Sequence, residues 1–163
     1  MSIVYSMPGH LIRRLQQISA SVFADQMREH GFDLTSPQFA ALTVLDKHPG
    51  VDQATLAGLI AHDRPTIGGV VDRLAKKGLV KRKSNPADGR AKLVHLTPHG
   101  VDVLARVLPI VLEMQVTILP GLTADERTEF TRLASIVAKA GNDLSRAPLL
   151  PVARKCAAKT ATD

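Results

Sequence analysis

The hydrophobic period of the chain changes at Gly78, and this change limits the folds that the sequence can adopt. Before Gly78, apolar residues such as Ile67, Val70 and Leu74 recur at steps of three and four, the spacing of a buried helix face. After Gly78, the segments "LVKRKS" and "AKLVHLT" carry the apolar residues Val80, Leu93 and Val94 with basic residues between them, which predicts two strands. The segment "NPADGR" between them is rich in turn-forming residues. We therefore expect a mainly α-helical fold with a small β-hairpin.

Start and stop signals place four helices before the hairpin. Pro8 suits the first turn of a helix that Gly31 closes. Thr35 or Ser36 can cap the second helix, and Asp52 can cap a short third helix in "VDQATLAGLIA". The fourth helix occupies "RPTIGGVVDRLAKKG". Three short helices therefore precede the hairpin directly, behind one long amphipathic helix.

The chain after the hairpin is predicted to be helical as well. Thr97 is placed to cap a long helix, and Thr123 with Glu126 has the spacing of a capping box. This last helix is expected to run to about Arg146. From Ala147 to residue 163 the sequence has prolines, small residues and a basic bias, which is typical of a flexible C-terminal tail.

Composition narrows the class of protein. The net charge is +6 and the pI is about 9.8, which suits a polyanionic partner, either nucleic acid or an anionic membrane surface. Cys156 is the single cysteine, so an internal disulfide is excluded and no second cysteine offers zinc-ligand spacing. A cytoplasmic protein is the simplest interpretation. The apolar stretch at 107–119 is too short and too polar to span a bilayer. No metal, cofactor or enzyme motif such as H-E-x-x-H or a phosphate loop is found.

The segment from residue 73 to residue 92 is strongly basic, and Asp88 is its only acidic residue. Three short helices and a basic hairpin are the parts of a winged helix-turn-helix. In that arrangement the third helix lies in the DNA major groove and the hairpin reaches along the backbone. The basic residues of the segment are Arg73, Lys76, Lys77, Lys81, Arg82, Lys83, Arg90 and Lys92. We therefore predict contact with nucleic acid rather than a merely solvated surface.

Four short motifs follow one another in this region: Asp72-Arg73-Leu74, Lys77-Gly78-Leu79, Asp88-Gly89-Arg90 and Leu96-Thr97-Pro98-His99-Gly100. Through these motifs the sequence resembles the MarR family of bacterial transcription regulators. The resemblance implies a homodimer in which residues 8–31 and 97–146 form a helical dimerisation region. Residues 32–96 would then form the winged helix-turn-helix DNA-binding domain, and residues 147–163 lie outside the resemblance. Long amphipathic helices at both ends also favour a dimer, because a small central domain cannot bury them.

A two-fold dimer would read a pseudopalindromic, double-stranded operator, and individual residues can be assigned roles on it. Thr66 can hydrogen-bond a base or a phosphate, and Arg64 suits either a guanine or a phosphate. Arg90 is similar to the family's arginine that enters the minor groove, with Asp88 orienting it; the alternative is an ordinary turn with a solvent ion pair. The full set of predicted DNA-binding residues is Asp63, Arg64, Thr66, Gly68, Gly69, Arg73, Lys76, Arg82, Lys83, Asp88 and Arg90.

Gly68 and Gly69 are unusual because each lies inside a short helix, where glycine costs about 1 kcal/mol relative to alanine. They are explained if the helix backbone passes close to a sugar-phosphate edge or a thymine methyl, where a Cβ would crowd. The alternative is that they let this helix pack tightly on its neighbour. Replacement by alanine distinguishes the two.

The first helix carries candidate ligand-binding residues. His10, Arg14 and Gln17 fall along one face beside its apolar stripe, so they can form an anion-recognising wall; solvated or inter-subunit ion pairs are the alternative. "PGHLIRRLQQI" together with "RPTIGGVVDRL" resembles a MarR subgroup linked to the breakdown of aromatic acids. This implies a repressor that is released by a small aromatic carboxylate or its CoA thioester. A winged-helix protein-interaction module without a small-molecule effector is the other interpretation.

Overall fold

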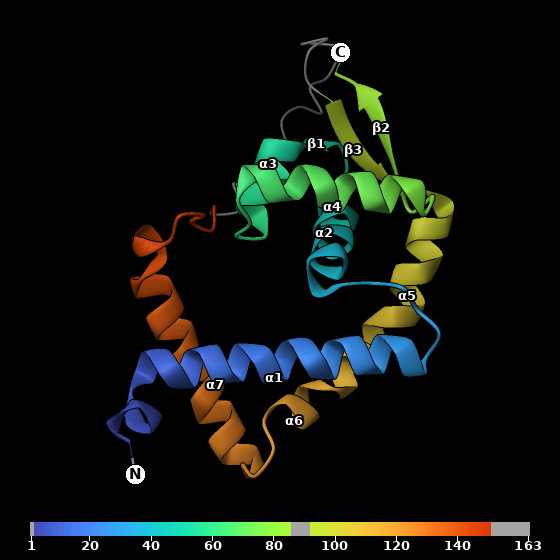
Figure 1. Cartoon of the computed structure of the whole chain (residues 1–163). Coiled ribbons are helices and arrows are strands. Elements are labelled where there is room, and N and C mark those ends of the chain that lie inside the picture. The colour runs from blue at the N-terminus through green and yellow to red at the C-terminus, as the bar shows by residue number, and fades with distance from the viewer. Residues whose placement is uncertain (1, 86–91, 151–163) are drawn as a thin grey trace, which may run out of the picture.

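The computed structural model describes residues 2–85 and 92–150, apart from the Arg64 side chain (Figure 1). Helices dominate, as predicted. The helices are η1 (Ile3–Ser6), α1 (Pro8–Glu29), α2 (Ser36–Lys47), α3 (Gln53–Leu59), α4 (Arg64–Lys76), α5 (Pro98–Glu113), α6 (Gln115–Ile118), α7 (Ala124–Ala140) and η2 (Asn142–Leu144). The strands are β1 (Val51–Asp52), β2 (Val80–Ser84) and β3 (Lys92–Leu96).

The predicted hairpin is present, but it belongs to a three-stranded antiparallel sheet with the order β1-β3-β2. β2 pairs with β3 from Val80 opposite Leu96 to Ser84 opposite Lys92. The additional strand, β1, pairs Val51 with Val94. The sequence did not predict β1, because two residues are too few to show an alternating pattern. Its pairing ties the middle of β3 to the start of α3.

The core lies where α2, α3 and α4 meet the sheet, and it is aliphatic, as the low aromatic content requires. One face of α4 contributes Ile67, Val70, Val71 and Leu74, which are at most 1% exposed. These side chains join one cluster with residues of α2, α3 and β3. Full burial of an aliphatic side chain stabilises the fold by about 1.5–3 kcal/mol, so this cluster fixes the position of α4.

The start of α5 is joined to the base of the sheet. The Thr97 hydroxyl donates to the carbonyl of Gly78 at 2.6 Å and accepts from the amide of Gly100 at 3.0 Å, which confirms Thr97 as the helix cap. The Thr97 amide also donates to the carbonyl of Leu79 at 3.0 Å. A Cβ placed on Gly100 would lie 2.0 Å from that same Leu79 oxygen. Only glycine allows this approach of α5 to the chain that enters β2.

The other caps also agree with the sequence, but the end of the last helix does not. Thr123 and Glu126 form the predicted capping box of α7. The expectation that this helix reaches Arg146 is wrong, since α7 ends at Ala140 and the short η2 follows. Gly141 lowers helix propensity at this point. The Asn142 side chain then accepts from the amide of Leu149 at 2.8 Å and donates to its carbonyl at 3.2 Å, which folds the chain back.

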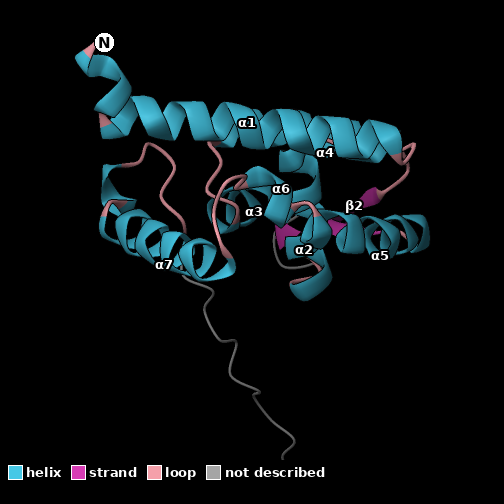
Figure 2. Ribbon diagram, turned by 90° about the horizontal axis from the view of Figure 1, so that it is seen from below, coloured by secondary structure: helices cyan, strands magenta, loops and turns pink. Residues whose placement is uncertain are grey.

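The long helices α1, α5 and α7 form an open frame, in which α1 and α5 also contribute side chains to the core. Figure 2 shows α1 along one side of the molecule, with α7 toward its N-terminal half and α5 toward its C-terminal half. All residues of α7 except Arg127 are exposed, and none is buried. Within the described residues, no helix has the length and apolar character needed to cross a bilayer.

Candidate nucleic-acid interface

The helix α4 has one buried face and one open face, which is the arrangement expected of a recognition helix. Its buried face is held by the core. On the other side, the exposed residues include Asp63 at the N-cap, Thr66, Arg73 and Lys76. α4 therefore presents a polar surface that the rest of the described chain leaves open.

Asp63 is the N-cap residue of α4, although its side chain makes no capping hydrogen bond to the helix backbone. The hydroxyl of Thr66 donates a hydrogen bond that, as the largest effect, holds the pKa of the Asp63 carboxyl below its ordinary value. The carboxyl is therefore ionised at neutral pH, close to the positive end of the helix dipole. Arg64 is the first residue of the helix. Thr66 is thus engaged in organising the helix start while remaining exposed.

The two glycines of α4 do not mark a tight contact between helices. A Cβ added to Gly68 would meet no described atom within 4 Å. A Cβ added to Gly69 would meet only the guanidinium of Arg73, at 3.4 Å from Nη1. Both glycines are half-buried. Close packing within the described chain therefore does not explain them, which favours the alternative that a second molecule approaches the helix backbone.

The basic residues at the end of α4 fall into two groups. Arg73 and Lys76 are exposed in the last turn. Lys77, by contrast, pairs with the Asp33 carboxylate at 2.9 Å and donates to Gln38 Oε1 at 3.2 Å. Lys77 therefore fastens α4 to the loop before α2, whereas Arg73 and Lys76 remain available to a polyanion.

Arg82 of β2 also has protein partners. Its Nη2 donates to the Asp72 carboxylate of α4 at 2.5 Å. With the Gln53 amide oriented so that its oxygen faces Arg82, that oxygen accepts from Nε and Nη2 at 3.1 Å each. Arg82 thus joins β2 to both α3 and α4. Lys83, the next residue of β2, is exposed.

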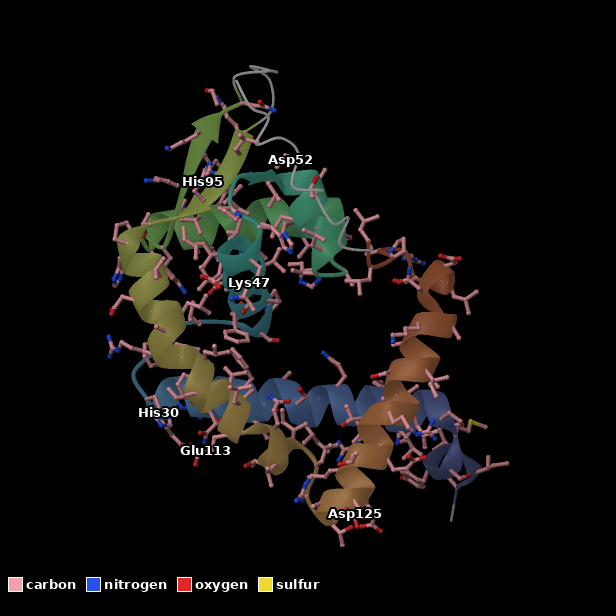
Figure 3. All side chains as sticks on the ribbon, turned by 180° about the vertical axis from the view of Figure 1, so that it is seen from behind. His30, Lys47, Asp52, His95, Glu113 and Asp125 are labelled. Atoms are coloured by element: carbon pink, nitrogen blue, oxygen red, sulfur yellow. The ribbon has the colours of Figure 1, made fainter. Side chains whose placement is uncertain are left out.

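The predicted wing residues Asp88 and Arg90 lie outside the described residues, and their roles stay predictions. The described part of the hairpin brings Lys81, Arg82 and Lys83 to the same end of the molecule as the start of α3. Figure 3 shows this end from behind, where His95 of β3 and Asp52 before α3 lie near each other. The ion pair of Arg82 with Asp72 joins this hairpin to α4, so the two elements lie side by side, as a winged helix-turn-helix requires.

Comparison with known proteins identifies the family. Residues 34–92 match the sequence profile of the MarR family. Over 119 residues, the chain is 34% identical to the HTH-type transcriptional repressor NicR of Pseudomonas putida, a match that covers 73% of this chain and 74% of NicR. This chain belongs to the MarR family.

Two solved MarR-type structures extend the similarity to the whole fold. The PcaV transcriptional regulator from Streptomyces coelicolor, in complex with its natural ligand, is 37% identical with a TM-score of 0.76, and the match covers 86% of this chain and 98% of PcaV. BpsR of Bordetella bronchiseptica, whose DNA binding is regulated by 6-hydroxynicotinic acid, is 28% identical with a TM-score of 0.74, over 81% of this chain and 93% of BpsR. The protein is therefore a DNA-binding MarR-type transcriptional regulator and not an enzyme.

The predicted ligand residues of this MarR-family chain lie apart from the DNA-binding surface. All three are on α1, where Arg14 and Gln17 are exposed and His10 is half-buried. The His10 ring meets the Tyr5 ring edge-on, with centroids 5.6 Å apart. None of the three lines the groove of about 850 Å³ between α6 and α7. A single chain does not bring them together around an enclosed site.

The sequence did not predict the contacts that hold the elements of the winged helix-turn-helix together. Asp72 precedes the basic segment directly, and an isolated carboxylate beside many cations was a usable signal for an ion pair with Arg82. Asp33, the partner of Lys77, is 44 residues away in sequence and gave no such signal. The contact of the chain's C-terminal part with α3 also had no signal in the sequence. In this contact the Leu150 amide donates to the carbonyl of Gly58 at 2.9 Å.

Proposed function

We propose that this protein is a homodimeric repressor that leaves a pseudopalindromic operator when a small aromatic carboxylate, or its CoA thioester, binds. The effector would be of the hydroxycinnamate, benzoate or hydroxynicotinate type. The observation that carries the proposal is the open polar face of α4 beside a basic hairpin, in a chain similar to BpsR, which 6-hydroxynicotinic acid regulates. Such a repressor acts in the cytoplasm.

The uncovered apolar stripe of α7 supports the homodimer. Leu133, Ile136 and Val137 are 48%, 51% and 63% exposed, and their spacing places them with Phe130 on one helix face. α5 adds Leu112, which is 64% exposed. An isolated amphipathic helix in water is only marginally stable, so this stripe needs a partner surface. We infer that residues 8–31 and 97–146 supply it from a second copy, while residues 32–96 bind DNA.

The mechanism follows from a shift between two dimer populations. A two-fold dimer reads two half-sites only when its α4 helices have the matching separation. An effector that binds better to a dimer with another separation draws the population away from the operator. Arg14 is suited to hold the carboxylate, because a guanidinium binds a carboxylate through two parallel hydrogen bonds. His10 and Gln17 would provide further polar contacts on the same face.

The experiment is operator binding measured by fluorescence anisotropy with the promoter region of the protein's own gene. Benzoate, hydroxycinnamates, 6-hydroxynicotinate and hydroxycinnamoyl-CoA are then titrated, and the same compounds are tested for an increase in Tm. We expect one class to raise Tm and release the DNA, and Arg14→Ala to abolish both effects without weakening operator binding. Gln16→Ala on the same helix is the control. If no compound changes either quantity, the effector class is wrong.

Arg90 is the second point of the proposal. We infer that it enters the minor groove and that Asp88 orients it, as the family motif implies. Arg90→Ala should then weaken operator binding at every salt concentration tested. Unchanged binding across the salt series would remove Arg90 from the interface and leave Asp88-Arg90 as an ordinary turn.

A further inference from the structure

The chain beyond α7 returns to the winged helix-turn-helix of residues 32–96, which we call the DNA-binding head. Figure 1 shows the red end of the described chain leaving the top of α7 and running toward α3 and α4. We call residues 141–150 the C-terminal strap. Its turn is closed by the Asn142 side chain, which bonds both the amide and the carbonyl of Leu149. The strap therefore has a defined shape of its own before it meets the head.

Leu150 docks the strap on α3. Its amide donates to the carbonyl of Gly58 at 2.9 Å. Its side chain lies directly over Gly58, where an added Cβ would be 2.3 Å from Leu150 Cδ1 and 2.5 Å from Leu150 Cγ. The absence of a side chain at Gly58 thus makes room for Leu150. A backbone hydrogen bond and a fitted side chain together fix the strap on the helix-turn-helix.

Docking places a cation beside the start of the recognition helix. Arg146 of the strap lines a groove of about 330 Å³ together with His62, Asp63 and Pro65, which are the turn before α4 and its first residues. Arg146 is exposed. Among the described acidic residues, none forms an ion pair with its guanidinium. The guanidinium is therefore held near the start of α4, in the same groove as the Asp63 carboxyl but without forming an ion pair with it.

We propose that the C-terminal strap is part of the DNA-binding surface and that Arg146 contacts a backbone phosphate beside the start of α4. This rests on operator binding by the head and adds a contact outside the helix-turn-helix and the wing. A guanidinium suits a phosphate because it can donate two parallel hydrogen bonds. Phosphate contacts also fix the register of a protein on the duplex, so Arg146 would help position α4 in the groove.

The test measures operator affinity and its dependence on salt for wild type, Arg146→Ala and Lys139→Ala. Lys139 is the matched control, because it is a cation in the last turn of α7 that lies outside the groove beside Asp63 and Pro65. Arg146→Ala should weaken binding at least about tenfold, as expected for a lost charge-assisted hydrogen bond in each protomer. The slope of log K against log salt should fall by roughly 2, about 0.9 for each phosphate contact. Lys139→Ala should change neither quantity by a comparable amount.

Gly58→Ala tests the docking separately. Alanine favours the helix by about 1 kcal/mol over glycine, so the head should keep or gain stability. The new Cβ displaces Leu150, and operator affinity should fall toward that of Arg146→Ala, with no additional loss in the double variant. If Arg146→Ala behaves like Lys139→Ala, or if Gly58→Ala binds like wild type, the proposal is wrong. Failure of the wild-type protein to bind the promoter region of its own gene would instead refute the proposed function.

Discussion

The guanidinium of Arg82 in β2 and the carboxylate of Asp72 in α4 are joined at 2.5 Å, so the hairpin and the recognition helix are directly connected. Arg82 is about a third exposed, and Asp72 is more exposed. An ion pair of this kind contributes about 0–1 kcal/mol to stability. Its value here is geometric, because it links β2 to α4.

A double-mutant cycle tests this connection. Asp72→Asn, Arg82→Ala and the double variant are compared for stability by urea unfolding, and we expect a coupling of roughly 0.2–1 kcal/mol. The salt dependence of operator binding should change less in Arg82→Ala than in Lys83→Ala, since the Arg82 charge already has a partner. A coupling of zero, with a large change in salt dependence for Arg82→Ala, would instead make Arg82 a free phosphate contact.

The glycine pair of α4 gives a second prediction. Gly68→Ala should raise the stability of the free protein by up to about 1 kcal/mol, because the added Cβ meets no described atom. If DNA approaches the helix backbone here, as the glycine pair predicts, the new methyl group should lower operator affinity at the same time. Gly69→Ala should also raise stability and lower operator affinity. The gain in stability should be smaller, because the Arg73 side chain must move slightly. Thermal melts and anisotropy titrations measure the two effects, and a loss of stability would support helix packing instead.

Gly100 gives a third prediction, in which alanine lowers the stability of the protein instead of raising it. Gly100→Ala should destabilise the protein by about 1–3 kcal/mol or more, because its Cβ would collide with the backbone oxygen of Leu79. Gly9→Ala in α1 is the control, since a Cβ there meets no described atom. Urea unfolding measures both. Equal stability of the two variants would mean that the junction between α5 and β2 can open without cost.

The cap of α3 leads to a dependence on pH. The Asp52 carboxylate (labelled in Figure 3) accepts from the amide of Thr55 at 2.9 Å and from its hydroxyl at 2.8 Å. The backbone hydrogen bond is the main reason why the pKa of Asp52 is below its ordinary value. A lowered folded-state pKa means that the stabilisation is fully present above about pH 4, the unfolded value, and is lost as the pH falls through the folded pKa.

Asp52→Asn measures that contribution. Asparagine is also a good helix cap but does not titrate, so the variant keeps the cap and loses the pH dependence. We expect the difference in the free energy of unfolding between wild type and Asp52→Asn to be constant from pH 7 to about pH 5. It should then decrease in favour of the variant as the pH falls further. Parallel acid titrations of the two proteins would exclude Asp52 as a source.

Local signals were sufficient for much of the fold. Thr97 and the pair Thr123 and Glu126 were recognised as caps because capping depends on residues within one helical turn. Long-range contacts were not accessible in the same way. The pairing of Val51 with Val94, and the contact of Leu150 with Gly58, join residues that only the folded chain brings together.

The candidate sites show the same division. Residues of α4 were identified because the helix pattern places them on one exposed face. Arg82 was predicted only as a DNA contact. The isolated carboxylate of Asp72 was a usable signal for its ion pair, but nothing local reveals that Gln53 also faces it. His10, Arg14 and Gln17 share a helix face. A ligand site there would also need residues from other elements, and helical spacing within α1 does not predict which these are.

The approach of Gly100 to the Leu79 oxygen also limits how this sequence can vary over evolution. Every replacement of glycine adds at least a Cβ, so no gradual series of side chains leads away from it. A lineage could change the residue only after the chain entering β2 had moved. We therefore expect this glycine to persist among descendants of the protein even where their effectors and operators diverge.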